Sequence, residues 1–187
     1  PIPPGVKGAI TAQSNVSSTG SIVIDGRDHT ITGALNGAPG TFGVSTSGDY
    51  TQSGSSLVGG AGAAPANPAA PSSYQENTPP TASLPWDILG VTEAWFNSNI
   101  LPQNVPPPQN NSGVYYYNPG PNNSWIGVNF GVSSGILIVH NSTNNAVMKN
   151  LTGTFVGLII TDAVEHVTGN ALIIGALVTT TQAGNAM

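Results

Sequence analysis

The sequence predicts a mainly β protein, a parallel β-solenoid that carries a long insertion rich in glycine and proline and one short helix. Three glycine-led apolar strands recur at residues 135–139, 157–161 and 175–179. Their first glycines are 22 and then 18 residues apart, and a period of about 20 residues is typical of a solenoid. The strands do not alternate apolar and polar residues, which favours parallel strands buried on both faces over a β-sandwich joined by hairpins.

The N-terminal residues contain two further strand candidates, at residues 9–12 and 21–24, each preceded by a glycine. They are short and rich in β-branched side chains, as strands are. We therefore expect residues 1–35 and 131–187 to form one stack of β-solenoid coils. Residues 36–130, with their Gly-, Ser- and Pro-rich stretches, are expected to form an insertion that leaves the stack and returns.

Inside this insertion, residues 84–97 have the apolar pattern of a helix. Ser83 is the expected N-cap, Pro85 suits the first turn, and Asp87 complements the helix dipole. Trp86 and Trp95 are expected to pack against the solenoid. An aromatic strand is expected near residues 114–118.

Composition excludes several function classes. Charged residues make up 6% of the chain, the formal net charge is −5, and only three residues are basic. Nucleic-acid binding needs clustered basic residues, so nucleic acid is not an expected partner. There is no cysteine, which removes disulfides and thiolate metal sites. No apolar run is long enough for direct membrane insertion. Because the sequence starts at Pro1, we expect that an N-terminal segment has been removed.

The inventory of chemically reactive residues is thin, and we predict neither an enzyme nor a cofactor. The densest group is Asp25, Asp28 and His29, which has two interpretations: weak metal ligands, or a turn in which Asp25 accepts local hydrogen bonds and Arg27 pairs with a carboxylate. A second group, at residues 162–166, contains Asp162, Glu165 and His166. It is expected to be a solvated corner between two strands, with His166 pointing outward.

Two regions are predicted to make contacts with other subunits. The triple tyrosine and the nearby tryptophan could mark an interaction surface, although such a run more often has one tyrosine buried and its neighbours at the rim. These residues are Tyr115, Tyr116, Tyr117 and Trp125. The C-terminal strand around Leu177 has almost no chain left to cover its edge, so we expect it to pair with another copy in a homo-oligomer.

A set of short motifs, in order along the chain, resembles the PilX-type pilus assembly proteins, minor-pilin-like components of type IV pilus systems. The motifs are residues 24–29 (IDGRDH), 84–90 (LPWDILG), 134–139 (SGILIV), 155–160 (FVGLII) and 169–176 (GNALIIGA). The resemblance implies a periplasmic or extracellular β-solenoid-like domain with pilin-like partners and no catalytic residues.

The expected function is therefore that of a structural component of a cell-surface filament or pilus system, located extracellularly or at the cell surface. The alternative is a solenoid that binds or degrades carbohydrate. In that case Trp86, Trp95, Tyr115–Tyr117 or Trp125 would line a groove.

Overall fold

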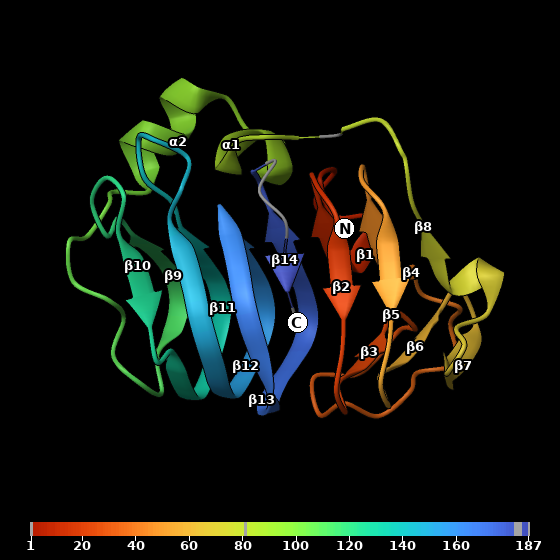
Figure 1. Cartoon of the computed structure of the whole chain (residues 1–187). Coiled ribbons are helices and arrows are strands. Elements are labelled where there is room, and N and C mark those ends of the chain that lie inside the picture. Colours follow the sequence, from red (N-terminus) through yellow and green to blue (C-terminus); the bar gives the residue numbers. More distant parts are fainter. Residues whose placement is uncertain (1, 81, 182–184, 187) are drawn as a thin grey trace.

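The computed structural model of the chain describes residues 2–80, 82–181 and 185–186. It is mainly β, with 46% strand and 8% helix, as the sequence predicts. Among the described residues, one large sheet has 11 strands and a second has three, and all strand pairs are parallel except that between Leu57–Gly60 and Ala63–Ala66. The two α-helices lie on one side of the large sheet (Figure 1), whereas the third helical element is a short 3-10 helix, η1 (Pro71–Ser73), just before residue 74.

Two halves of the chain supply the strands. The N-terminal half, residues 8–75, holds β1 (Gly8–Ala12), β2 (Val16–Ser18), β3 (Val23–Asp25), β4 (Phe42–Thr46), β5 (Tyr50–Gln52), β6 (Leu57–Gly60), β7 (Ala63–Ala66) and β8 (Tyr74–Gln75). The C-terminal half, residues 112–179, holds β9 (Ser112–Tyr117), β10 (Ser124–Ile126), β11 (Asn129–Val139), β12 (Val147–Thr161) and β13 (Ala163–Thr179). A short strand, β14 (Asn185–Ala186), follows them.

The order of the strands in space differs from their order in the chain. Along the large sheet the neighbours are β9, β11, β12, β13, β1, β4 and β8. The last long strand therefore pairs with the first strand of the chain, in the middle of the sheet. Residues from both ends of the chain thus belong to one sheet.

The expected insertion at residues 36–130 does not lie outside the sheets. Strands β4 to β8 extend the N-terminal half beyond β1, and β9 and β10 extend the C-terminal half beyond β11 and β12. The aromatic strand expected near residues 114–118 is β9. Sequence patterns did not identify the other strands because they are short, two to five residues each, and rich in Gly, Ser and Ala rather than β-branched residues.

One row of side chains runs in register through both halves, and we call it the inner row. Its members pair one after another along the seven neighbouring strands, and five of them are buried. Because parallel in-register strands place equivalent side chains directly above each other, the row forms a continuous apolar column. It consists of Tyr115, Leu137, Ile159, Leu177, Ile10, Val44 and Tyr74.

The inner row is part of a single hydrophobic cluster that also receives side chains from two other sets of paired segments. One set pairs Trp125 with Met148 and Met148 with Val164. The other pairs Ser133 with Phe155 and Phe155 with Ile173. Long strands such as β12 and β13 bend and contribute to more than one set, which is why they reach 15 and 17 residues.

The neighbouring positions on the same strands point away from this cluster and form an outer row. Its members in the C-terminal half are Tyr116, Ile138, Ile160 and Val178, which pack with Ile88 and Phe96 of the two helices. Both faces of these strands are thus buried, which explains why their sequences do not alternate. In the N-terminal half the outer row continues as Thr11, Ser45 and Gln75.

Glycine is required where the strands of the C-terminal half bend. Gly113, Gly135, Gly157 and Gly175 pair in register, and each has a positive φ. A Cβ on Gly157 would overlap the carbonyl oxygen of Gly135, and one on Gly175 would overlap that of Gly157. Glycine is therefore needed both for the backbone angle and for the close approach of adjacent strands.

The segment expected to form one helix forms two short ones. Helix α1 (Pro85–Leu89) ends at Gly90, which has φ 72°, and α2 (Glu93–Asn99) begins after Thr92, whose hydroxyl accepts the Trp95 N–H. Pro85 and Asp87 lie in the first turn as predicted, but Leu84 rather than Ser83 occupies the N-cap position. A left-handed glycine is a common helix terminator, and it separates the two helices here.

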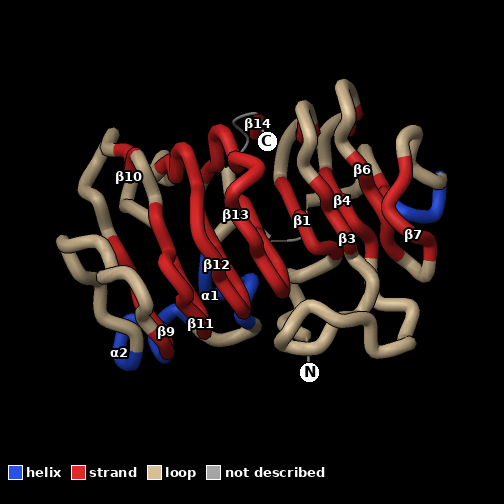
Figure 2. The backbone as a smooth tube through the Cα atoms, turned by 90° about the horizontal axis from the view of Figure 1, so that it is seen from below, coloured by secondary structure: helices blue, strands red, loops and turns tan. Residues whose placement is uncertain are grey.

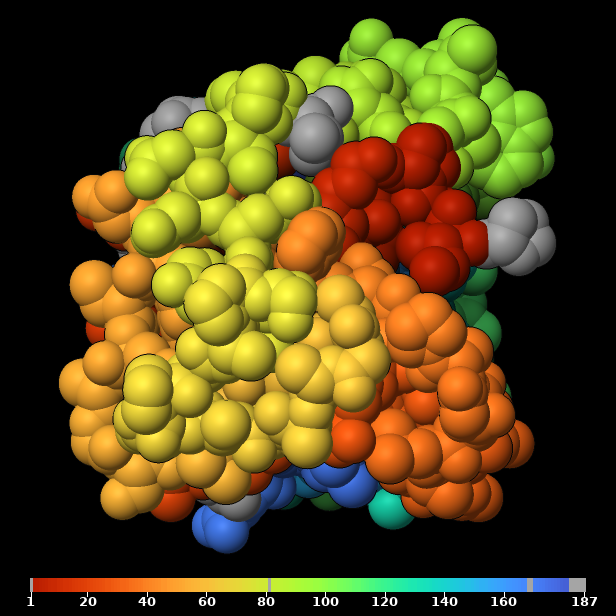
Figure 3. All heavy atoms as spheres, turned by 90° about the vertical axis from the view of Figure 1, so that its right-hand side faces the viewer, coloured from red at the N-terminus to blue at the C-terminus, as the bar shows by residue number. Residues whose placement is uncertain are grey.

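Proline-containing segments lie at both ends of the molecule, one beside the large sheet and one in the three-stranded sheet. Beyond β9, Gln103 pairs with Tyr117 in a stretch that contains Pro102 and, just after it, residues 106–108. Beyond β6, the antiparallel strand β7 contains Pro65, and the chain around it covers that end of the molecule, which Figure 3 shows in yellow. Proline cannot donate a ladder hydrogen bond, so these segments limit further strand pairing.

Candidate functional site

The residues that were weak metal candidates form a hydrogen-bonded turn. The Arg27 guanidinium contacts both carboxylate oxygens of Asp25, with Nη2 to Oδ2 at 2.6 Å, and the Arg27 N–H also donates to Asp25. His29 Nε2 lies 3.5 Å from the same carboxylate, while Asp28 accepts a bond from Asn36. Partial burial alone would raise the pKa of Asp25, but the bonds from Arg27 lower it below its ordinary value. The turn interpretation therefore describes this group.

The second acidic group of the sequence is not a cluster in space. Asp162 is fully buried, Glu165 pairs with Lys149 at 2.7 Å, and His166 is exposed at a residue with φ 59°. The outward orientation predicted for His166 agrees with its exposure. Among the residues that the structure describes, no three His, Asp or Glu side chains come together as metal ligands do.

A buried carboxylate, that of Asp162, lies at the bend between β12 and β13. Its carboxylate accepts bonds from His140 Nδ1 at 2.7 Å, from Thr180 Oγ1 at 2.9 Å, and from the backbone N–H groups of Asn141 and Ala146. The partners lie in the segments that follow β11 and β13, and Asp162 itself follows β12, so the bonds join the ends of three neighbouring strands. Four donors satisfy the hydrogen-bonding capacity of this buried carboxylate, so Asp162 links the C-terminal ends of β11, β12 and β13.

The His140–Asp162 pair, with a 2.7 Å hydrogen bond, resembles part of a catalytic triad. Its surroundings oppose that role, because His140 is 5% exposed and Asp162 is 0% exposed. Two aromatic rings lie against His140: Trp86 edge-on and Tyr116 stacked, each with centroids 6.3 Å away. A general base must reach a substrate, and these contacts leave His140 with a structural role.

The three tyrosines expected to form an interaction surface lie on two opposite faces of β9. Tyr116 is buried beside Phe96 and His140, and burial together with the charge of Asp162 raises its pKa to about 12. Tyr115 and Tyr117 are half-buried on the opposite face of β9, against the main hydrophobic cluster. The prediction of one buried tyrosine with partly exposed neighbours agrees with this arrangement. Trp86, in α1, packs against Phe96 and His140, whereas Trp95, which was also expected to pack, is 49% exposed.

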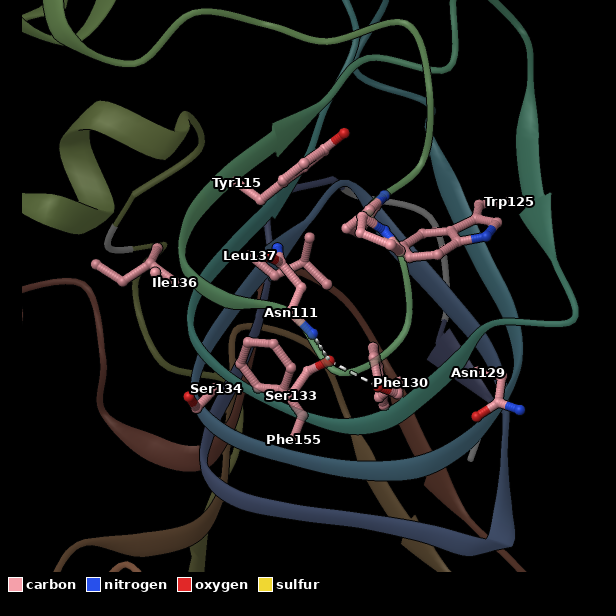
Figure 4. A pocket seen from close by; sticks show the side chains of 13 residues that line it. Asn111, Tyr115, Trp125, Asn129, Phe130, Ser133, Ser134, Ile136, Leu137 and Phe155 are labelled. Atoms are coloured by element: carbon pink, nitrogen blue, oxygen red, sulfur yellow. Dashed lines mark hydrogen bonds between the residues drawn. The ribbon is translucent and has the colours of Figure 1, made fainter.

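A small hollow, shown in Figure 4, lies at the β9 end of the hydrophobic cluster, and Pro107 and Pro108 are among the residues that line it. Tyr115, Trp125 and the amide side chains of two asparagines are among its lining residues. The hollow has room for about one water molecule. It therefore brings together Tyr115 and Trp125, which the sequence singled out, but does not admit a sugar ring. The asparagines are Asn111 and Asn129.

The expectation that Leu177 forms an exposed, self-pairing edge is wrong. Leu177 is 0% exposed, and its strand lies between β12 and β1, paired with Ile159 on one side and Ile10 on the other. The expectation treated the end of the sequence as the end of the sheet. The N-terminal half occupies that edge instead, and sequence patterns contain no signal for such a long-range pairing.

Sequence reasoning did not identify the residues that matter most in these networks. His140 was not assigned a role, and the four-fold bonding of Asp162 depends on strands that are adjacent only in space. Among the described residues, no helix is long and apolar enough to cross a membrane. In comparisons with protein-family models, curated proteins and solved structures, nothing matches this chain, so a functional assignment rests on the geometry.

Proposed function

We propose that the paired segments are the faces of a parallel β-solenoid, and that the chain is a non-enzymatic structural protein of an extracellular filament or pilus-like assembly. The observation that carries the proposal is the inner row, which runs unbroken across both halves and into one hydrophobic cluster. Stacked equivalent positions around a narrow apolar interior are the defining feature of a solenoid.

The distribution of ionisable groups supports a structural role. Two carboxylates with close side-chain partners, Asp25 with Arg27 and Asp162 with His140, are engaged in a turn and a bend. A solenoid with few charged residues suits a subunit of an assembly, because it presents little like-charge repulsion to its neighbours. The order of short motifs that resembles PilX-type proteins supports pilin-like subunits as partners.

The solenoid is tested by contacts across its interior. Leu137, Met148 and Phe155 belong to three different sets of paired segments, and a solenoid brings their side chains into one interior. Selective methyl and aromatic labelling should therefore give NMR contacts from Leu137 to the other two. Contacts confined to in-register neighbours such as Ile159 would indicate an open sheet and contradict the solenoid.

The cellular role is tested by locating the protein. Immunogold labelling of intact cells should decorate surface filaments, and deletion of the gene should reduce or shorten them. Labelling that appears only after the cells are permeabilised would overturn the proposal of an extracellular structural protein.

Carbohydrate binding is the second candidate, and the hollow beside Tyr115 and Trp125 is the observation in its favour. Aromatic rings and amide groups are common in binding sites, but here a sugar would have to lie on the rim. Binding on a glycan array that is lost in Trp125→Ala, with unfolding unchanged, would favour this function. An absence of binding to neutral and acidic glycans would leave the structural role.

A further inference from the structure

The loop between β3 and β4 carries an asparagine that is followed directly by glycine. This loop, residues 26–41, is drawn in tan in Figure 2, and both Asn36 and Gly37 are exposed in it. Theirs is the only Asn–Gly pair in the sequence. The backbone nitrogen that follows an asparagine can attack the side-chain amide, and glycine obstructs this attack least because it has no side chain.

The backbone nitrogen of Gly37 is accessible to solvent and free to react. Its N–H has no hydrogen-bond partner among the residues that the structure describes. A Cβ built on Gly37, where φ is 88°, would meet no atom within 4 Å. Solvent hydroxide can therefore reach this N–H and remove its proton. The attack that follows is intramolecular, so no second reactant has to be positioned.

The Asn36 side chain is held with its carbonyl group polarised. The Ala38 N–H donates to Asn36 Oδ1 at 3.0 Å, and Asn36 Nδ2 donates to Asp28 Oδ2 at 2.6 Å. When the Gly37 nitrogen bonds to Asn36 Cγ, negative charge develops on Oδ1, the atom that the Ala38 N–H already contacts. A donor that is in place where an oxyanion forms lowers the barrier to the reaction.

We infer that Asn36 is a site of self-modification, at which the amide is converted to a carboxylate through a cyclic imide. The deprotonated Gly37 nitrogen forms a bond to Cγ, the Cγ–Nδ2 bond breaks, and Nδ2 leaves as ammonia after taking a proton from water. Water then adds to one of the two imide carbonyl carbons and breaks its bond to nitrogen. Opening at Cγ gives aspartate, and opening at the backbone carbon gives isoaspartate, in which the main chain runs through the side chain.

The conversion brings two carboxylates together in the turn. The hydrogen bond from Asn36 to Asp28 is replaced by repulsion between like charges. The same turn is closed by the Asn36 N–H, which donates to the Asp28 carbonyl oxygen at 3.1 Å, and by the pairing of His29 with Leu35. We therefore expect the modified turn to open. This inference does not depend on the proposed filament role, because it rests on the chemistry of this loop alone.

Mass spectrometry of peptides from the intact chain, incubated in its folded state and sampled over weeks, tests the site. Residue 36 should be converted to aspartate and isoaspartate at least about tenfold faster than Asn97, because Asn97 and Ser98 lie in α2 and must leave the helix before they react. An amide that survives at residue 36, or conversion of Asn97 at an equal rate, would overturn the inference.

The matched control for the reaction is Asn36→Gln. This variant keeps an amide at residue 36, but its longer side chain would have to close a larger ring, so it should remain unmodified over the same period. Conversion of Asn36→Gln at the rate of the parent chain would show that ring closure by Gly37 is not the route, and it would also overturn the inference.

Two further variants test the effect on the turn. Asn36→Asp reproduces the aspartate product and should raise amide hydrogen exchange at residues 30–36 by about tenfold. Adding Asp28→Asn to this variant exchanges the two groups, so that an amide again donates to a carboxylate, and exchange should return to the rate of the parent chain. Slow exchange in Asn36→Asp, or fast exchange that persists in the double variant, would contradict opening of the turn by charge repulsion.

Discussion

The two halves of the molecule build the same inner row but surround it differently. In the C-terminal half the outer row is aliphatic or aromatic and lies beneath two helices, so both faces of each strand are dry. In the N-terminal half the outer row consists of Thr11, Ser45 and Gln75, and the Gln75 amide donates to the Ser45 hydroxyl at 2.8 Å. Register is continuous between the halves, whereas the chemistry of the covered face changes at the β13–β1 pairing.

The strands of the two halves are stabilised in different ways. Strands whose two faces are both apolar need a second layer to cover the outer face, which α1 and α2 provide. They also need glycines where neighbouring strands bend and approach closely. The polar side chains on the outer row of the N-terminal half are hydrogen-bonded instead: the Thr11 hydroxyl accepts the N–H groups of Lys7 and Gly8, and the Ser45 hydroxyl accepts the Gln75 amide. Buried hydroxyls are tolerated because they are bonded in this way.

The largest expected effect concerns the glycine column of the C-terminal half. Gly157→Ala should lower the free energy of unfolding by at least about 4 kcal/mol, because the new Cβ overlaps the Gly135 carbonyl in addition to backbone strain. Gly113→Ala is the matched control in the same column. It also has a positive φ but no atom within 4 Å of the new Cβ, so strain alone should cost about 1–3 kcal/mol. Equal losses in urea unfolding would show that close approach is unimportant.

The second effect concerns the bend at Asp162. Asp162→Ala should lower the free energy of unfolding by about 3–5 kcal/mol, because four donors including His140 lose a buried acceptor. The N-terminal half offers a control, Asp49→Ala, which removes an exposed carboxylate bonded to the Asn77 amide. That change should stay within about 0.5 kcal/mol. Similar denaturation midpoints for the two variants would contradict the role assigned to Asp162.

A third effect is alkaline sensitivity of the C-terminal half. The pKa of Tyr116 is raised from 10.0 to about 12 in the folded state by burial and by the charge of Asp162. Its contribution is therefore complete below pH 10 and is lost as the pH rises towards 12, by roughly 3 kcal/mol in total.

The measurement is the free energy of unfolding at pH 9 and near pH 12. Tyr116→Phe should remove most of the difference between these two values. Tyr50 is a partly buried tyrosine of the N-terminal half whose pKa is also raised. Tyr50→Phe should leave most of the difference in unfolding free energy between the two pH values unchanged. An alkaline loss that is unchanged in Tyr116→Phe would contradict this prediction.

The smallest effect is expected when one outer-row residue in each half is replaced by the type found in the other half: an aliphatic residue by a hydroxyl-bearing one, and the reverse. Ile160→Thr places a hydroxyl between Ile138 and Val178, where no polar neighbour in the row can pair with it, and Thr11→Val leaves the Lys7 and Gly8 N–H groups without their acceptor. Each change should cost about 1–3 kcal/mol. If thermal unfolding showed either variant as stable as the parent chain, the contrast between the halves would not reflect different requirements.

Much of the C-terminal half could be predicted from the sequence. The recurring glycines and the non-alternating aliphatic runs indicated parallel strands buried on both faces, and residues 135–139, 157–161 and 175–179 lie within β11, β12 and β13. The turn at Asp25, the outward position of His166 and the packing of Trp86 also followed from local patterns. These features depend on neighbours in the chain or on a repeat of one period, and both are visible in a single sequence.

The tertiary structure alone decided which strand lies beside the C-terminal strand. Pairing of Leu177 with Ile10 joins residues that are far apart in the chain, and local propensity carries no information about such a contact. That one pairing buries the edge expected to be free, and it places the N-terminal half beside the C-terminal half. The bonding of Asp162 depends on long-range pairing in the same way, because its donors come from different strands. Hydrophobic pattern selects which face of a strand is buried, whereas the identity of its neighbour is set by the packing of the whole chain.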